Sequence, residues 1–199
     1  RSYAINHITQ TLSTTGPMFW SLCGHHGDQV SASNGKNYQV VFACNVNQGI
    51  YRVDITLDQE GRTEAQQIAD NQLLLPLTGS DNDGHISGAQ SVANQDWCWM
   101  SPENTSPGGG VKAYRNEILR VNVLTLEIQR YAHSRTNPAA GYYPQPRVQS
   151  SPDGTRVLWS CDGTGFTGSG LGLYVVELAT PLIGPPAPGK VFRLSRPSF

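Results

Sequence analysis

The sequence contains few charged residues and no strong excess of either sign. Charged side chains make up 15% of the 199 residues, the formal net charge is −1, and lysine occurs only as Lys36, Lys112 and Lys190. This balance provides no general electrostatic attraction to nucleic acid or to an anionic membrane surface. The sequence also lacks an apolar run of about 18 residues, so it predicts no membrane span.

Long helices are disfavoured as well. The chain contains 21 glycines and 13 prolines, spread along its whole length, and both residues interrupt helices and mark turns. Its polar character comes mainly from Asn, Gln, Ser, Thr and Gly, a balance that is common in secreted all-β proteins. The composition therefore favours an all-β chain of short strands.

The motifs of several enzyme classes are missing. The glycine-rich stretch GTGFTGSGLG, Gly163–Gly172, lacks the Lys-Ser/Thr pair of a phosphate-binding loop, and no G-x-S-x-G nucleophile motif occurs. None of the four cysteines forms a C-x-x-C pair, which argues against a zinc knuckle or a thioredoxin-type redox site. Because no complete catalytic set is recognised, a non-enzymatic role is favoured.

Three parts of the chain repeat one pattern of strand, polar loop and strand. The pattern begins with YQVVFAC, QDWCWMS and TRVLWSC, each taken as the second strand of its unit, and they end at Cys44, Ser101 and Cys161, 57 and then 60 residues apart. Each is followed by IYRVDI, ILRVNV or LYVVEL, whose alternation is typical of half-buried strands. A further short segment, EAQQIAD, EIQRYAH or KVFRLSR, is expected to form a fourth strand, and YAINHIT near the N-terminus looks like the same element.

A unit of about 58 residues with four short strands is typical of a β-propeller blade. One blade cannot cover both of its own faces, so Phe42, Trp99 and Trp159 on the second strands are expected to fill the space between blades. The SNG and SPDG steps predict turns between the innermost and second strands. Residues 1–199 are thus interpreted as one β-propeller-type domain with units at 7–63, 64–129 and 130–180, a proline-rich connector at 181–190 and the start of a further strand at 191–199.

The motifs of the third unit resemble a known family. SSPDGTRVLWSCDG, followed by LYVVEL, resembles the WD40-like PD40 repeat of the periplasmic TolB-type propellers. The stretch from GHISGAQ through QPRVQSSPDGTRVLWS is also similar to a broader group of bacterial secreted propellers, to which the oligogalacturonate lyases belong. The second unit, SVANQDWCWMSP, lacks the SPDG step. The resemblance implies a propeller fold and a secreted or periplasmic location.

The number of units is smaller than a closed propeller needs. Propellers usually contain about four to eight blades, and this sequence shows three units. Arg1 is not an initiator methionine, so we expect a processed product or a portion of a longer propeller. The alternatives are a dimer of half-propellers and an open array with exposed faces. Further blades would come from the same longer chain or from another copy.

Candidate functional residues lie at the starts of the innermost strands. His26, His85 and Gln145 occupy equivalent places in the three units, 59 and 60 residues apart. Because the oligogalacturonate lyases build a metal site from histidines and a glutamine at such places, the resemblance implies a divalent metal at His26 and His85. Arg147 belongs to the stretch where those enzymes carry a histidine-containing motif, and a guanidinium is not a metal ligand.

Two other interpretations of these residues stay open. In the first, His26, His85 and Gln145 only hydrogen-bond the neighbouring backbone at the mouth of the channel. In the second they bind a ligand together with Arg147 and Tyr143, since a guanidinium beside aromatic rings suits an acidic sugar or a peptide carboxylate.

Two covalent features are also predicted. If the protein is oxidised, Cys23 and Cys44 form the preferred disulfide because both lie in the first unit, whereas Cys44 and Cys161 are separated by an intervening blade. The tripeptide Asn104-Thr105-Ser106 matches the N-glycosylation pattern and makes Asn104 a candidate acceptor.

The residues and the resemblance together favour a non-enzymatic β-propeller module that binds a protein or a glycan, or that builds an assembly outside the bacterial cytoplasm. One alternative is a metal-dependent polysaccharide lyase of the oligogalacturonate-lyase type. Another is a structural subunit of an extracellular assembly.

Overall fold

The structure of the chain is a computed structural model that describes residues 5–6, 11–12, 26–43, 49–57, 63–77, 84–89, 91–103, 113–134, 136, 145–161, 172–178 and 190–194. Within these residues the fold is all-β apart from one short α-helix and one 3₁₀ turn. The all-β fold class predicted from composition and strand patterning is therefore confirmed.

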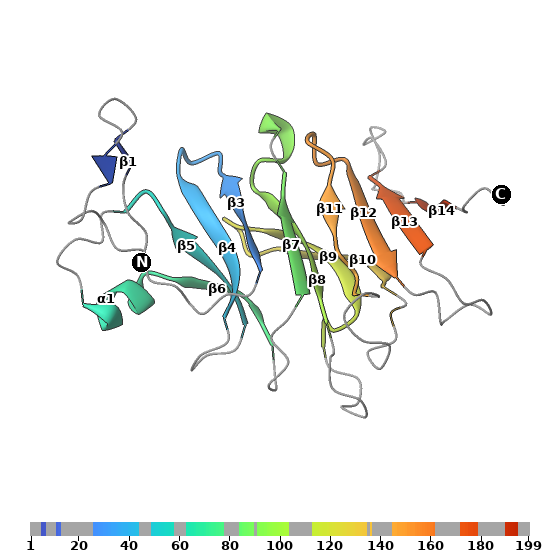
Figure 1. Ribbon diagram of the computed structural model, residues 1–199, viewed down its shortest axis with the longest axis horizontal. Helices are drawn as coiled ribbons and strands as arrows, with labels where there is room; N and C mark the ends of the chain where they lie inside the picture. Colours follow the sequence, from blue (N-terminus) through green and yellow to red (C-terminus); the bar gives the residue numbers. More distant parts are fainter. Residues whose placement is uncertain are drawn as a thin grey trace.

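Most strands belong to three four-stranded antiparallel sheets, each with its strands in chain order (Figure 1). The first sheet consists of β3 (Gly27–Ser31), β4 (Asn37–Ala43), β5 (Gly49–Asp54) and β6 (Gln72–Pro76). The second consists of β7 (Gly84–Gly88), β8 (Trp97–Pro102), β9 (Glu117–Asn122) and β10 (Ile128–His133). The third consists of β11 (Gln149–Ser150), β12 (Arg156–Cys161), β13 (Gly172–Glu177) and β14 (Lys190–Leu194). A separate two-stranded ribbon pairs β1 (Ile5–Asn6) with β2 (Thr11–Leu12).

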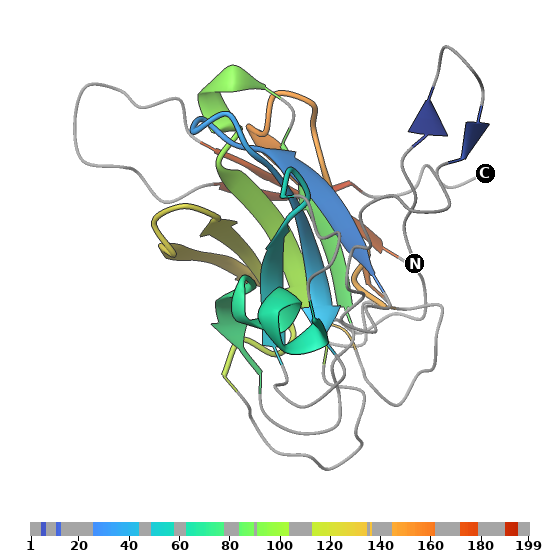
Figure 2. The ribbon, with the colours of Figure 1, turned by 90° about the vertical axis from the view of Figure 1, so that its left-hand side faces the viewer.

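The first strands of the three sheets lie next to one another. Strand β7 contacts β3 on one side and β11 on the other, and the sheets stand side by side in Figure 1 and one behind another in Figure 2. Adjacent sheets thus meet along their first strands, as blades do. The described residues form an open row of three blade-like sheets and not a closed ring.

Apolar side chains fill the two junctions between the sheets. Phe42 belongs to the cluster between the first and second sheets, which also contains Val40 and Met100. Trp99 and Trp159 both belong to the cluster between the second and third sheets. The predicted aromatic residues are therefore buried between sheets, but the two tryptophans share one junction instead of filling one each.

The predicted turns between the first and second strands of a sheet are confirmed in the first and third sheets. Gly35 of the SNG step has φ +79° and Gly154 of the SPDG step has φ +69°, a left-handed conformation that glycine adopts without steric cost. Each turn is closed by a backbone hydrogen bond, from Ala32 N to Lys36 O at 2.8 Å and from Ser151 N to Arg156 O at 2.9 Å.

Asp153 stabilises the SPDG turn and makes it sensitive to acid. Its carboxylate accepts hydrogen bonds from the Ser151 hydroxyl and the Thr155 amide, which lower its pKa to about 2. This contribution to stability is complete above the ordinary carboxyl pKa of about 3.9 and is lost as the pH falls toward about 2. Asp153→Asn is therefore expected to lower the midpoint of urea unfolding at pH 7, and the difference from wild type should shrink between about pH 4 and pH 2. A difference that does not change with pH would contradict this role of the carboxylate.

The segment EAQQIAD is a helix and not the strand expected from the repeat. Helix α1 spans Glu64–Ala69, and the fourth strand of the first sheet is β6, which follows it. Thr63 and Gln66 form a capping box, in which the Gln66 amide donates to Thr63 Oγ1 at 3.3 Å and the Thr63 amide donates to Gln66 Oε1 at 2.8 Å. Among the described residues no helix is long and apolar enough to cross a membrane.

Candidate functional site

The predicted histidines meet where the first strands of two neighbouring sheets begin. His26 directly precedes β3 and His85 is the second residue of β7, and their ring centroids lie 4.3 Å apart with the planes tilted by 38°. Both side chains are half-buried. The carbonyl of His26 accepts a hydrogen bond from the Phe42 amide at 3.3 Å, which continues the β3–β4 ladder by one residue. The structure thus brings together two sequence-predicted residues that lie 59 positions apart.

Gln145 and Arg147 lie on the segment that leads into β11. The Gln145 carbonyl accepts a hydrogen bond from the Ser160 hydroxyl at 3.0 Å, and the Pro146 carbonyl accepts one from Ser101. Because Ser101 pairs with His85 in the β7–β8 ladder, the backbone beside Gln145 contacts the immediate neighbour of the histidine pair. Arg147 is exposed.

The amide group of Gln145 differs from most buried polar groups in its hydrogen bonding. Gln145 is only 8% exposed, and its Oε1 atom is buried with no hydrogen-bond partner among the described residues. A buried acceptor without a donor costs free energy, so such an atom marks a place where a donor from water or a ligand is favourable.

Metal binding at this place stays a prediction. In the part of the chain that the structure describes, no group of three or more His, Cys, Asp or Glu side chains could hold a metal ion. His26 and His85 would supply two imidazole ligands, and tetrahedral zinc sites use three or four protein ligands.

Several predicted residues lie outside the described residues. They are Tyr143, the glycosylation candidate Asn104 and both members of the proposed disulfide, Cys23 and Cys44. The contribution of Tyr143 to a ligand site, the Asn104 modification and the Cys23–Cys44 bond all stay predictions. Cys98 and Cys161 are both fully buried.

Polar contacts between the sheets hold the first strands, which carry the histidines, and no motif in the sequence predicts these contacts. The Gly88 amide donates to Asp28 Oδ2 at 2.9 Å across the first junction. Across the second junction, the Ser150 amide donates to Ser87 Oγ at 3.0 Å and the Ser150 hydroxyl donates to the Gly88 carbonyl at 2.9 Å. Each first strand is thereby tied to the next by direct hydrogen bonds.

The segment SVANQD stands in the second sheet where the third has the SPDG turn, and it forms hydrogen bonds with the turns of the first and third sheets. It contains the 3₁₀ helix η1 (Val92–Asn94). On one side, Asp96 accepts hydrogen bonds from the Ser33 amide at 2.6 Å and the Ser33 hydroxyl at 2.7 Å. On the other, Ser91 and Asn94 both donate to the Asp153 carbonyl at 2.8 Å. The segment SVANQD, which differs from the repeat, therefore contacts the neighbouring turn on each side.

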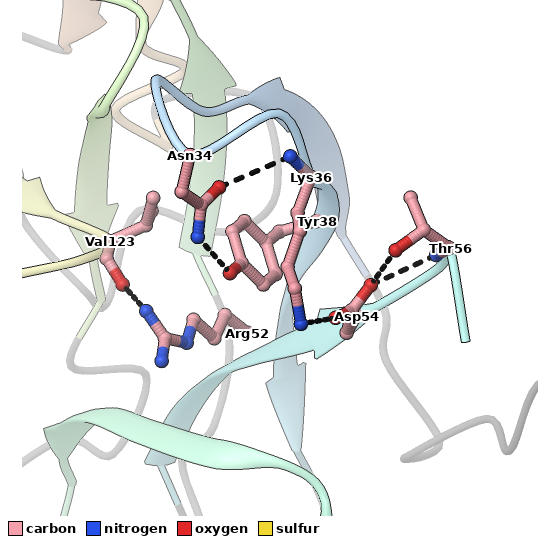
Figure 3. A network of polar contacts seen from close by, with 7 residues as sticks. All are labelled: Asn34, Lys36, Tyr38, Arg52, Asp54, Thr56 and Val123. Atoms are coloured by element: carbon pink, nitrogen blue, oxygen red, sulfur yellow. Dashed lines mark hydrogen bonds and ion pairs between the residues drawn. The ribbon is translucent and has the colours of Figure 1, made fainter.

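An arginine completes the first junction (Figure 3). Arg52 on β5 donates a hydrogen bond to the Val123 carbonyl of the second sheet, and its guanidinium lies 4.9 Å from the ring centroid of Tyr38. Beside it, Lys36 forms an ion pair with Asp54 at 2.7 Å. Burial acts to raise the pKa of the Asp54 carboxyl, but hydrogen bonds from Lys36 and Thr56 outweigh it and hold the pKa below its ordinary value.

A signal for this contact was present in the sequence. Arg52 in IYRVDI and Arg120 in ILRVNV occupy the same place in the repeat, whereas LYVVEL has Val175 there. A charged residue repeated at one strand position suggests a shared contact.

The three sheets establish a blade-like all-β architecture, while the finer assignment to TolB-like propellers depends on the sequence motifs alone. No family model, no curated protein and no solved structure matches the chain.

Proposed function

We propose that the chain is a non-enzymatic β-propeller-type module that binds a protein or a glycan at the end of the sheets where His26 and His85 meet. The observation that carries this proposal is the contact between the two imidazole rings at 4.3 Å, formed by residues at equivalent places of two repeats. Binding residues are often grouped in this way at the ends of rigid strands.

The surrounding groups suit a polar ligand. Half-buried imidazoles both donate and accept hydrogen bonds, and the buried Gln145 Oε1 is an acceptor to which no described residue donates. Arg147 adds an exposed cation nearby in the chain. Hydroxyl, amide and carboxylate groups of a glycan or a peptide would match this set.

The outward face of the third sheet supports a role in assembly. Leu173 is 47% exposed on this face, next to the half-buried Leu158 and Val175. We propose that further blades, from a longer chain or from another copy, pack here, and that the protein acts in a secreted or periplasmic setting. The low charge and the PD40-like motifs support that location.

A binding and turnover comparison tests the proposal. The wild-type chain is applied to an oligosaccharide array, with His26→Ala and His85→Ala as site variants and His133→Ala, an exposed histidine on β10, as the matched control. We expect at least tenfold weaker binding for the two site variants and wild-type binding for the control, because only the former remove imidazoles from the pair. A protein ligand would be mapped with the same variants.

The metal-dependent lyase is the second candidate, and the histidine pair is the observation that favours it. It predicts one tightly held divalent ion per chain and the release of unsaturated sugars from pectic fragments, both lost in His85→Ala. Finding both would overturn the non-enzymatic proposal, whereas binding without turnover would support it.

A further inference from the structure

Arg120 is a buried cation that, within the described residues, donates its hydrogen bonds to neutral groups and to no carboxylate. It lies on β9 of the second sheet and is only 8% exposed. Its Nη1 atom donates to Asn94 Oδ1 at 3.3 Å and its Nη2 atom to Gln129 Oε1 at 2.8 Å. Its Nε atom is buried and has no hydrogen-bond partner among the described residues. Both acceptors are neutral amides. An unpaired buried charge is costly unless a counter-charge is supplied.

The equivalent arginine shows that Arg120 does not simply repeat a structural contact. Arg52 donates to the Val123 carbonyl of the next sheet. Leu178 occupies the place of Val123 in the third repeat. Within the described residues, however, Arg120 donates hydrogen bonds only to Asn94, which precedes β8, and to Gln129 on β10 of the same sheet. Linking two sheets is therefore the role of Arg52 and not of Arg120.

Aromatic rings surround the Arg120 guanidinium. It lies 4.1 Å from the ring centroid of Trp97, 5.8 Å from that of Trp99 and 5.9 Å from that of Tyr131. The rings hold the guanidinium in place through cation–π attraction, which supplies no negative charge. Burial lowers the pKa of Arg120 below its ordinary value, and the opposing effects of Tyr131 and Glu127 do not offset it.

Gln129 occupies the position that a carboxylate would take. Its Oε1 atom accepts from Arg120 Nη2 at 2.8 Å and from the Tyr131 hydroxyl at 2.7 Å, and its Nε2 atom donates to Glu127 at 2.7 Å. Gln129 is half-buried and Glu127 is exposed. The side chain that covers the guanidinium therefore reaches the surface, where it can move aside.

We propose that Arg120, Trp97, Gln129 and Tyr131 form a binding site for the carboxylate of a small ligand. The carboxylate displaces the Gln129 amide oxygen, accepts from the Nε–Nη2 edge of Arg120 and from the Tyr131 hydroxyl, and neutralises the buried charge. A planar carboxylate matches this two-donor edge of a guanidinium.

This site is separate from the histidine pair. Trp97 and Ser101, the partner of His85, lie four residues apart on β8, which is roughly 13 Å along a strand. The carboxylate site therefore does not depend on the proposed function, and variants at one site leave the other intact.

Titration of the full chain with acetate, glucuronate and glucose, followed by tryptophan fluorescence, tests the site. We expect a saturable response to glucuronate and none to glucose, because only the former carries a carboxylate. A response to acetate would show that the carboxylate is sufficient, and its absence beside a glucuronate response would show that the sugar ring also contributes. Equal responses to glucuronate and glucose, or no saturation by either carboxylate, would overturn the proposal.

Three variants assign the response to residues. Arg120→Gln should weaken binding at least tenfold, whereas Arg52→Gln, at the equivalent place in the first sheet, should leave it unchanged. Gln129→Glu keeps Arg120 and places a tethered carboxylate on it, so it should abolish binding and raise the Tm. A Gln129→Glu protein that still binds glucuronate, or that melts no higher than wild type, would contradict the proposal even if Arg120→Gln fails to fold.

Discussion

Replacing Gly88 with alanine is expected to lower the free energy of unfolding by about 3 kcal/mol, because the added methyl group forces two sheets apart. A Cβ atom at this position would lie 2.3 Å from the Gln29 carbonyl oxygen and 3.2 Å from Val30 Cγ2. Gln29 and Val30 belong to β3 of the first sheet, whereas Gly88 ends β7 of the second. Since the closest atom is part of the backbone, no change of rotamer relieves the clash.

The two junctions share this glycine, which increases the expected effect. The Gly88 amide donates to Asp28 on one side, and its carbonyl accepts from the Ser150 hydroxyl on the other. A shift of β7 away from β3 breaks the first hydrogen bond and disturbs the second. The loss of stability caused by the extra methyl group is therefore increased by the loss of these hydrogen bonds.

Gly35→Ala is the matched control. Gly35 has φ +79°, but apart from its two neighbours in the chain no described residue lies within 4 Å of a Cβ built there. Only the cost of the left-handed conformation therefore applies, about 1 kcal/mol. Urea unfolding of both variants gives the comparison. Equal losses in the two variants would show that the close approach at Gly88 does not hold the sheets together.

Strands and turns could be predicted from the sequence because their causes are local. The alternation in IYRVDI and the Asp-Gly step before Thr155 depend only on neighbouring residues. The helix at Glu64–Ala69 also has a local cause, the Thr63–Gln66 capping box. The repeat nevertheless predicted a fourth strand at this place. In this case a repeat-based prediction was wrong where the local signal was right.

The arrangement of the tryptophans could not be predicted by aligning the repeats. Trp99 pairs with Arg120 and Leu158 pairs with Val175, so Leu158 and not Trp159 is the structural equivalent of Trp99. A shift of one residue along a strand moves a side chain to the opposite face of its sheet. Trp159 therefore points back toward the second sheet and meets Trp99 in the same cluster.

The candidate sites also differ in whether the sequence predicts them. Counting along the repeats identified His26 and His85, because both follow from the period of the sequence. Arg120 was not predicted, since the neutral partners of its guanidinium among the described residues depend on which side chains the folded sheets bring around it. No short motif shows which residues will surround a buried charge in the folded protein.

Trp159→Ala is expected to lower the free energy of unfolding by about 4 kcal/mol, the usual cost of removing a large buried aromatic side chain. Trp159 is almost fully buried, its ring lies 5.4 Å from that of Tyr174, and its indole nitrogen donates to the Ser134 carbonyl of the second sheet at 3.4 Å. Because this side chain links the two sheets, the third sheet should loosen first. Hydrogen exchange should accelerate at the amides of β12 and β13 while β4 and β5 stay protected.

Leu158→Ala, one residue away on the opposite face, supplies the control. It also tests whether the outward face of the third sheet is covered by further blades. Leu158 is half-buried on the outward face, so its truncation in an isolated chain should cost only about 1 kcal/mol. If further blades pack on that face, the same substitution should cost more in the assembled protein than in the isolated chain, because Leu158 would then be fully buried. A loss for Leu158→Ala in the isolated chain as large as that for Trp159→Ala would contradict the open row, since both faces of the third sheet would already be covered.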